Sequence, residues 1–181
     1  WGPRLHNHFT WLFNELLKGG GVGANYSTDL LRELPVPTGQ VELTFCDPAS
    51  NFTEEESVAS QLCSPSTAGS VFEIPDSREG WVLALQKLID LAQDGGGQLC
   101  FNISAIRPAG APILGFGGIA SGPGPLIELL KGTADILNDN NGKALKTLDC
   151  MLIDHQIASC VISGNVRRSA RMSLCHWNDP E

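Results

Sequence analysis

The stretch Ser163-Gly164-Asn165-Val166-Arg167-Arg168-Ser169-Ala170 decides how the C-terminal part of this chain folds. It closes an apolar helical run and opens a short β-like run, so it predicts a helix–loop–strand unit with a glycine turn. Its adjacent arginines suit phosphate groups or planar base edges, because the guanidinium fork gives bidentate and permanently charged donors. The formal net charge of −8 argues against a nucleic-acid surface. The stretch therefore indicates a contact with a small anion or a nucleotide.

The spacing of apolar residues predicts the other elements. Helices are expected over residues 8–18, through 81–92, from about 126 to 137 and over 143–162, and strands over 41–46, 71–74, 99–106 and 170–175. Asn7 is expected to cap the first helix and Gly19 to follow its end. Asp76 stands where a capping box before the second helix would begin. No internal repeat is evident.

Two other glycine-rich segments could approach a ligand. Gly19–Gly23 has more glycines than a helix end requires, and its bare backbone could donate amides to phosphate. Gly115-Phe116-Gly117-Gly118-Ile119-Ala120 fits the spacing of a dinucleotide fingerprint. The preceding strand ends too early, however, and no acidic residue follows at a strand end, so a Rossmann domain is disfavoured. Ser121 is expected to cap the next helix, whose N-terminus would favour anions.

Composition excludes several classes of protein and site. Hydrophobic residues make up 42% of the chain, as in soluble globular proteins, and no apolar run approaches the roughly 20 residues that cross a bilayer. The six cysteines form no Cys-x-x-Cys pair, so we expect free thiols rather than a disulfide framework or a zinc site. No histidine has metal-ligand spacing. The first and last residues lead us to expect an internal piece of a longer chain, which binds a nucleotide-like anion and shows no catalytic group.

Five ordered segments together resemble ribonucleotide reductases. They are Leu-Leu-Lys-Gly-Gly-Gly-Val-Gly at 16–23, Asp-Ser-Arg-Glu-Gly-Trp at 76–81, Ile-Arg-Pro-Ala-Gly-Ala-Pro-Ile-Leu-Gly-Phe-Gly-Gly at 106–118, Ala-Ser-Gly-Pro at 120–123 and Gly-Asn-Val-Arg-Arg-Ser-Ala at 164–170. Their order and spacing are similar to those of the monomeric, adenosylcobalamin-dependent class (class II), which reduces ribonucleoside triphosphates. The resemblance implies an α/β fold, namely part of the ten-stranded α/β barrel of ribonucleotide reductases, interrupted by an α+β insertion domain.

The resemblance also implies three parts. Residues 1–26 would begin the catalytic barrel with a helix and a glycine-rich substrate loop. Residues 27–102 would form the insertion domain that replaces a dimer partner at the effector site, and residues 103–181 would continue the barrel with two specificity loops. One alternative is a dimeric class II reductase or a class I large subunit, in which the glycine segment runs almost directly into the Ile-Arg segment. The other is a non-catalytic nucleotide-binding regulatory module.

Individual residues acquire roles through the same resemblance. The residues implied in substrate binding are Gly20, Gly21, Ser121 and Arg167. The residues implied in effector binding and specificity are Arg107, Pro108, Gly110, Gly117, Gly118, Asn165, Val166, Arg167 and Arg168. Arg107 would contact the phosphates of a deoxyribonucleoside triphosphate effector, beside a first specificity loop at 108–118. A second loop at 164–170 would lie between effector and substrate. No catalytic or metal-binding residue is implied in this chain.

The chemistry implied is reduction of ribonucleoside triphosphates to deoxyribonucleoside triphosphates for DNA synthesis. Adenosylcobalamin would initiate a thiyl radical on a barrel cysteine, and a cysteine pair, re-reduced by a thioredoxin-like protein, would supply the electrons. The motifs around those cysteines and most of the cobalamin site are absent from this sequence, so we expect this chain alone to be inactive. We expect the complete enzyme to be monomeric and cytoplasmic, with neither a nucleic-acid nor a membrane partner.

Overall fold

The computed structural model describes residues 1–47, 70–113, 118–163 and 170–179. Their elements follow in the order α1 (His6–Leu17), β1 (Gly21–Asn25), α2 (Thr28–Leu31), β2 (Val41–Cys46), β3 (Ser70–Glu73), α4 (Arg78–Gln93), β4 (Gly97–Asn102), α5 (Gly124–Asp139), α6 (Thr147–Ser163) and β5 (Ala170–Leu174). All expected helices and strands are present, with shifted ends: β4 stops four residues earlier than expected, and α6 begins four residues later. β1 and the short α2 were not expected.

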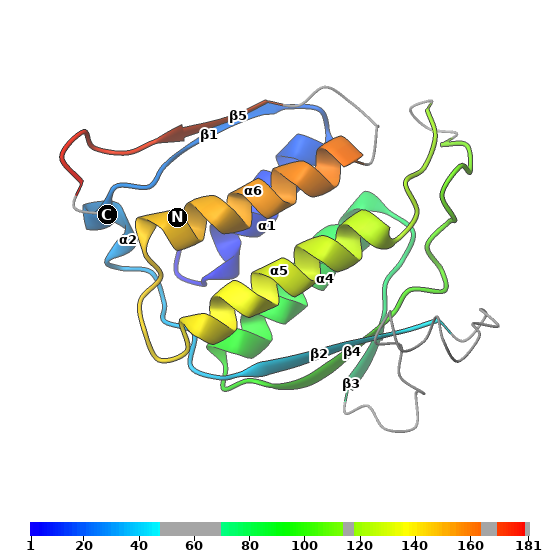
Figure 1. The fold of residues 1–181 in the computed structure, drawn as a ribbon, viewed down its shortest axis with the longest axis horizontal. Helices are drawn as coiled ribbons and strands as arrows, with labels where there is room; N and C mark the ends of the chain where they lie inside the picture. The colour runs from blue at the N-terminus through cyan, green and yellow to red at the C-terminus, as the bar shows by residue number, and fades with distance from the viewer. Residues whose placement is uncertain (48–69, 114–117, 164–169, 180–181) are drawn as a thin grey trace.

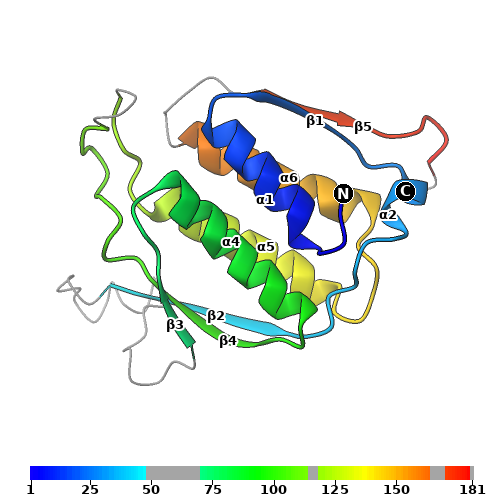
Figure 2. The ribbon, with the colours of Figure 1, turned by 180° about the vertical axis from the view of Figure 1, so that it is seen from behind.

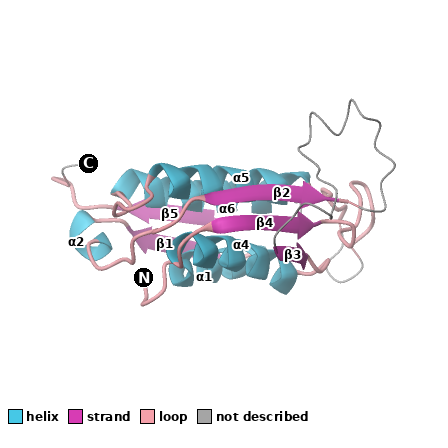
Figure 3. Ribbon diagram, turned by 90° about the horizontal axis from the view of Figure 1, so that it is seen from below, coloured by secondary structure: helices cyan, strands magenta, loops and turns pink. Residues whose placement is uncertain are grey.

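Four helices lie between two parallel sheets. β1 pairs with β5, and β4 lies between β2 and β3 in a separate three-stranded sheet. α1 and α6 lie next to the two-stranded sheet, and α4 and α5 lie next to the three-stranded one (Figures 1 and 2). Seen from below, the layers run parallel along the long axis of the molecule (Figure 3). Helices packed on parallel strands confirm the α/β class.

The core forms where the apolar stripes of the four helices meet. α1 buries Phe9, Leu12, Phe13 and Leu16, which recur at helical spacing. α4 and α5 bury similar stripes. Each such side chain contributes about 1.5–3 kcal/mol when removed from water.

The α1–β1 and α4–β4 segments are two copies of one local arrangement. Each helix is followed by a glycine in the left-handed region, Gly19 with φ of 83° and Gly95 with φ of 112°, and a parallel strand begins two residues later. Each buried residue of α1 has a buried counterpart in α4 at the same separation along the chain. Phe9 of α1, for example, corresponds to Leu85 of α4. This repeat is not evident from the sequence, because the two units share little beyond glycines and an apolar pattern.

The predicted helix caps Asn7 and Ser121 are wrong. Asn7 lies inside α1, which begins at His6, and its Oδ1 instead accepts a hydrogen bond from the backbone N–H of Arg4 at 2.8 Å. Ser121 lies three residues before α5, where no side chain caps the helix, and its Oγ donates to the Gly122 carbonyl at 3.3 Å. In both places the chain enters the helix with αR backbone at the N-cap position, which removes the geometry that a capping side chain needs.

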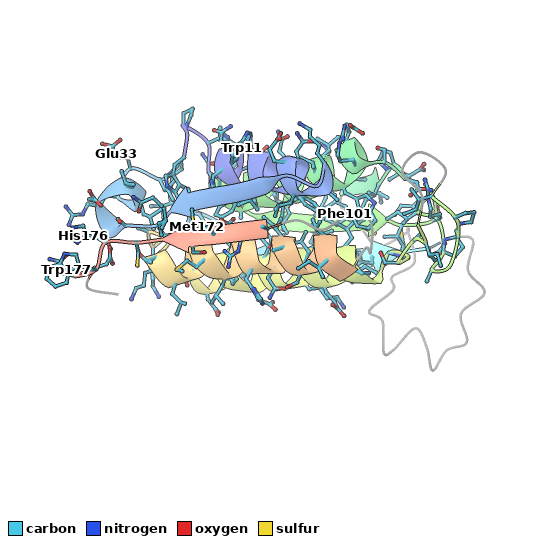
Figure 4. All side chains as sticks on the ribbon, turned by 90° about the horizontal axis from the view of Figure 1, so that it is seen from above. Trp11, Glu33, Phe101, Met172, His176 and Trp177 are labelled. Atoms are coloured by element: carbon cyan, nitrogen blue, oxygen red, sulfur yellow. The ribbon has the colours of Figure 1, made fainter. Side chains whose placement is uncertain are left out.

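The outer face of the β1–β5 sheet is exposed and partly apolar. Met172 and Leu174 are 57% and 50% exposed, and both project from β5 on the face away from the helices. Figure 4, seen from above, shows this sheet nearest the viewer with Met172 on it. None of the helices in the described residues is long and apolar enough to cross a membrane.

Candidate functional site

Several loops meet at one end of the four-helix layer. The C-terminal ends of α1 and α6 and the N-terminal ends of α4 and α5 all point to this end (Figure 1). The backbone N–H groups at a helix N-terminus carry partial positive charge, so α4 and α5 favour an anion at their own N-termini, whereas the C-terminal ends of α1 and α6 carry partial negative charge. This end also carries residues 18–21, 76–77, 107–113 and 118–123, which belong to the segments singled out in the sequence.

Arg107 is held at this end by two acceptors. Its Nε donates to Asp76 Oδ2 at 2.6 Å, and its Nη1 donates to the Pro112 carbonyl at 3.3 Å. Both members of the Arg107–Asp76 ion pair are about one third exposed. The guanidinium is thereby oriented by a carboxylate while remaining accessible to solvent, which suits an arginine that meets a phosphate.

Asp76 has this role because another residue caps α4. The sequence suggests Asp76 as the cap, but that prediction is wrong: Ser77 occupies the N-cap position, and its Oγ accepts a hydrogen bond from the Gly80 N–H at 3.0 Å. Ser77 has extended backbone, as N-cap residues usually do. The Asp76 carboxylate is therefore available to Arg107. Sequence reasoning missed this partner, because it assigned Asp76 to the cap.

The segment after Arg107 folds back on itself. Gly110 and Ala120 are joined by a hydrogen bond from the Gly110 N–H to the Ala120 carbonyl at 2.9 Å, and Pro112 forms an isolated antiparallel bridge with Ile119. Gly110 and Gly118 have φ of 88° and 102°, a conformation that favours glycine. Pro108, Gly110 and Gly118 are all exposed. Gly117 lies outside the described residues, as do Gly115 and Phe116 at the start of the fingerprint-like segment.

Gly20 and Gly21 differ in whether their backbone is open to a ligand. The Gly20 N–H donates to the Glu15 carbonyl at 3.0 Å, so this amide is used within the helix end. Gly21 is exposed, and a Cβ added to it would meet no atom within 4 Å. A ligand could therefore approach the backbone at Gly21 closely, whereas the Gly20 amide is already occupied.

The structure brings the glycine segment next to the end of the arginine loop. β1 and β5 pair in parallel, with Gly21 opposite Ala170. Asn165, Val166, Arg167 and Arg168 lie outside the described residues, but α6 ends at Ser163 and β5 begins at Ala170. Ala170, the last residue of the 164–170 loop, is thus the strand partner of Gly21, the first residue of β1. Arg171 follows and points inward, donating from Nη1 to Tyr26 Oη and to the Met151 carbonyl, both at 3.3 Å.

The described cysteines differ in burial. Cys46, Cys100, Cys150 and Cys160 are buried, and Cys175 is exposed. Burial, with the nearby charge of Glu128, raises the pKa of Cys160 to about 12, so this thiol stays protonated at neutral pH. Among the residues that the structure describes, no group of three or more His, Cys, Asp or Glu side chains is arranged to hold a metal ion.

Known proteins resemble this chain in sequence and in structure. A family model described as B12-dependent ribonucleotide reductase, insertion domain, matches residues 51–137. A putative adenosylcobalamin-dependent ribonucleoside-triphosphate reductase of Mycobacterium phage D29 is 40% identical over 99% of this chain and 28% of its own length. The adenosylcobalamin-dependent ribonucleoside-triphosphate reductase of Levilactobacillus brevis is 37% identical over 92% of this chain and 24% of its own length.

A solved structure has the same fold. The crystal structure of a B12-dependent (class II) ribonucleotide reductase superposes with a TM-score of 0.80 at 35% identity, covering 94% of this chain and 25% of that chain. The present chain therefore spans about a quarter of the length of the relatives it matches.

Proposed function

Because this chain belongs to the B12-dependent (class II) ribonucleotide reductases, we propose that it is the part of a ribonucleoside-triphosphate reductase that senses a deoxynucleotide effector and selects the substrate. The complete enzyme would reduce ribonucleoside triphosphates to deoxyribonucleoside triphosphates for DNA synthesis. The Gly21–Ala170 pairing carries this proposal, since it fixes the end of the arginine loop beside the exposed backbone of the glycine segment.

The effector would bind near Arg107. The guanidinium would contact its phosphates while Asp76 and the Pro112 carbonyl keep the side chain in place. Pro108, Gly110, Gly117 and Gly118 would shape the first specificity loop around the nucleotide. The N-termini of α4 and α5 would add favourable potential for the phosphate charge.

The substrate would lie on the other side of the 164–170 loop. Gly21 would offer its backbone, Arg167 would reach the substrate, and Gly20 and Ser121 would line the same region. Asn165, Val166 and Arg168 would take part in the loop's response to the effector. A glycine-hinged loop with two arrangements can transmit this response, because an effector that binds one arrangement more tightly shifts the population toward it.

The α4–β4 unit would stand in for a second subunit. It repeats the helix–glycine–strand arrangement of α1–β1 and packs against it within the four-helix layer. The insertion domain proposed for residues 27–102 contains this unit, and the unit also lies within residues 51–137, which the family model matches. An enzyme with its own substitute partner would respond to effectors as a monomer. Residues 1–26 and 103–181 would belong to the α/β barrel, whose other strands would cover the exposed outer face of the β1–β5 sheet.

Adenosylcobalamin, which the relatives' names include, does not fit the groups described in this part of the chain. His6 lies 2.6 Å from Asp90 and His8 lies 2.8 Å from Asp154, and four of the described thiols are buried. We place most of the cobalamin site, the cysteines that reduce the ribose and the contact with a thioredoxin-like reductant in the part of the enzyme beyond this chain. The complete enzyme would act in the cytoplasm.

The test uses the full-length enzyme with adenosylcobalamin and a dithiol reductant. Reduction of two competing ribonucleoside triphosphates is measured with and without each deoxyribonucleoside triphosphate. Arg167→Ala should reduce the effector-induced change in substrate preference about tenfold while the protein remains folded. Absence of any deoxynucleotide product from the unaltered enzyme would favour a non-catalytic module, and effector response only at dimer-forming concentrations would favour a dimeric reductase.

A further inference from the structure

A largely buried polar network joins α1, α6, β5 and the residue that follows β1. Asp154 of α6 is fully buried, and its Oδ2 accepts a hydrogen bond from Tyr26 Oη and lies 2.8 Å from His8 Nε2. Tyr26, also fully buried, directly follows β1, and His8 lies on α1. Arg171, the second residue of β5, donates to Tyr26 Oη at 3.3 Å.

Along the chain, the members of this network lie before and after two segments that the proposed function uses. α1 and β1 precede and follow residues 18–20, and α6 and β5 precede and follow residues 164–169. Arg171 binds both Tyr26 Oη and the Met151 carbonyl of α6, so one guanidinium ties the strand after the arginine loop to the helix before it. The Thr147 hydroxyl, at the start of α6, donates to the Tyr26 carbonyl at 2.7 Å and fixes the backbone as well as the phenol.

The energetics of the network point to positioning rather than to stability. A buried carboxylate costs several kcal/mol to remove from water, and well-packed apolar side chains commonly stabilise a core as well or better. Asp154 Oδ1 has no hydrogen-bond partner among the described residues, so the carboxylate is only partly satisfied. Burial and the Asp154 charge raise the pKa of Tyr26, which keeps its hydroxyl protonated and able to donate. The directional bonds fix the relative placement of α6 and β5, which apolar contacts would leave free to slide.

We propose that the His8–Asp154–Tyr26–Arg171 network positions the ends of the 164–170 loop against the glycine segment, and that it thereby sets how strongly an effector changes substrate preference. This inference rests on the proposed role of that loop. Tyr26, Asp154 and His8 act through the backbone and touch neither nucleotide. They are positioning residues, and Arg171 transmits their placement to β5.

The test compares two variants with matched controls in the full-length enzyme. Tyr26→Phe removes one buried hydroxyl and keeps the ring that contacts Trp1 and His8. Its control is Thr133→Val, which removes a buried hydroxyl in α5 that has no hydrogen-bond partner among the described residues. Asp154→Asn is compared with Asp90→Asn, the same change on α4 away from both loops.

Tyr26→Phe should reduce the effector-induced change in substrate preference about fivefold or more, while effector-free turnover and the effector Kd change less than twofold. Thr133→Val should leave the preference change intact. An unchanged preference response in Tyr26→Phe, with only a lower unfolding temperature, would assign the network to stability and overturn the inference. Tyr26→Phe keeps this test decisive even where Asp154→Asn fails to fold.

Arg167→Ala separates this inference from the function on which it rests. If Arg167→Ala loses the preference response while Tyr26→Phe keeps it, the positioning role is contradicted and the proposed function of the loop is not. If Arg167→Ala keeps a normal preference response, both the proposed function of the loop and the positioning role are contradicted.

Discussion

Arg107 and Asp76 lie 31 positions apart in the chain, and their side chains form a 2.6 Å Nε–Oδ2 hydrogen bond at the end of the four-helix layer. The bond is possible because Ser77 caps α4 and leaves the neighbouring carboxylate free for another partner. It orients a permanently charged guanidinium beside the N-termini of two helices. The proposed effector site depends on this relationship.

Replacing Asp76 by Asn should weaken effector binding about fivefold, or ~1 kcal/mol, because Arg107 loses the charge that orients it. The free energy of unfolding should change little, since the ion pair is about one third exposed. Ser77→Ala is the matched control: it should lower the free energy of unfolding by about 1 kcal/mol through loss of the cap. Calorimetric titration with a deoxyribonucleoside triphosphate and denaturant unfolding measure the two effects. Equal effector affinity in the parent and in Asp76→Asn would contradict the proposed orientation.

Gly21→Ala should fold normally yet bind substrate less tightly. A Cβ at this position meets nothing within 4 Å, and no positive φ is required there, so the free energy of unfolding should stay within about 0.5 kcal/mol of the parent. The added methyl group would occupy the space through which the substrate approaches the backbone, raising KM several-fold. Gly96→Ala is the contrasting variant: its φ is 77° and its Cβ would lie 2.3 Å from the Gln40 carbonyl, so it should unfold easily. An unchanged KM in Gly21→Ala would rule out a substrate contact at this backbone.

The ion pairs that Arg4 and His6 form with Asp90 and Asp94 of α4 should weaken in acid. Burial raises the pKa of Asp90, but hydrogen bonds from Arg4 and His6 more than offset this, so the pKa lies below its usual value. A hydrogen bond from Arg4 likewise lowers the pKa of Asp94. Carboxylates with depressed folded-state pKa values stabilise the protein fully above the ordinary Asp pKa of about 3.9, and this contribution is lost as pH falls through the folded-state value.

Asp90→Asn should therefore lower the unfolding temperature at pH 6, and its difference from the parent should shrink as pH falls below about 4. Differential scanning fluorimetry across this range gives the comparison. Gln86→Ala, which removes a longer 3.4 Å hydrogen bond to the same carboxylate, is the control and should have a smaller effect. A difference that stays constant down to pH 2 would show that the Asp90 charge does not contribute.

Cys160 should resist alkylation in the native protein. With a pKa of about 12 its thiolate fraction at pH 8 is roughly a thousandfold smaller than that of an ordinary thiol. Iodoacetamide labelling followed by peptide mass spectrometry should find Cys175 modified and Cys160 intact, and both should react in denaturant. Labelling of both sites at similar rates in the native protein would contradict the burial of Cys160.

Local sequence patterns determined the elements of this protein. Apolar spacing gave α1, α4, α5 and α6, and Gly19 marked the end of the first helix, because helix periodicity and glycine's access to positive φ are local properties. The ordered glycine and arginine segments were enough to indicate the reductase family. The placement of individual caps failed at Asn7, Asp76 and Ser121, since several polar residues near a helix start compete and small backbone differences decide between them.

Tertiary structure alone decided which of these residues meet. It pairs Gly21 with Ala170, places the Asp76 carboxylate against Arg107, and buries Asp154 against His8 and Tyr26. His8 and Asp154 are 146 positions apart, and no local pattern relates them. Such pairs form because parallel strand pairing and helix packing bring distant segments to one place, and because a buried charge must find partners there. The arginine loop is recognisable from its own residues, but its position beside the glycine segment is a property of the folded chain.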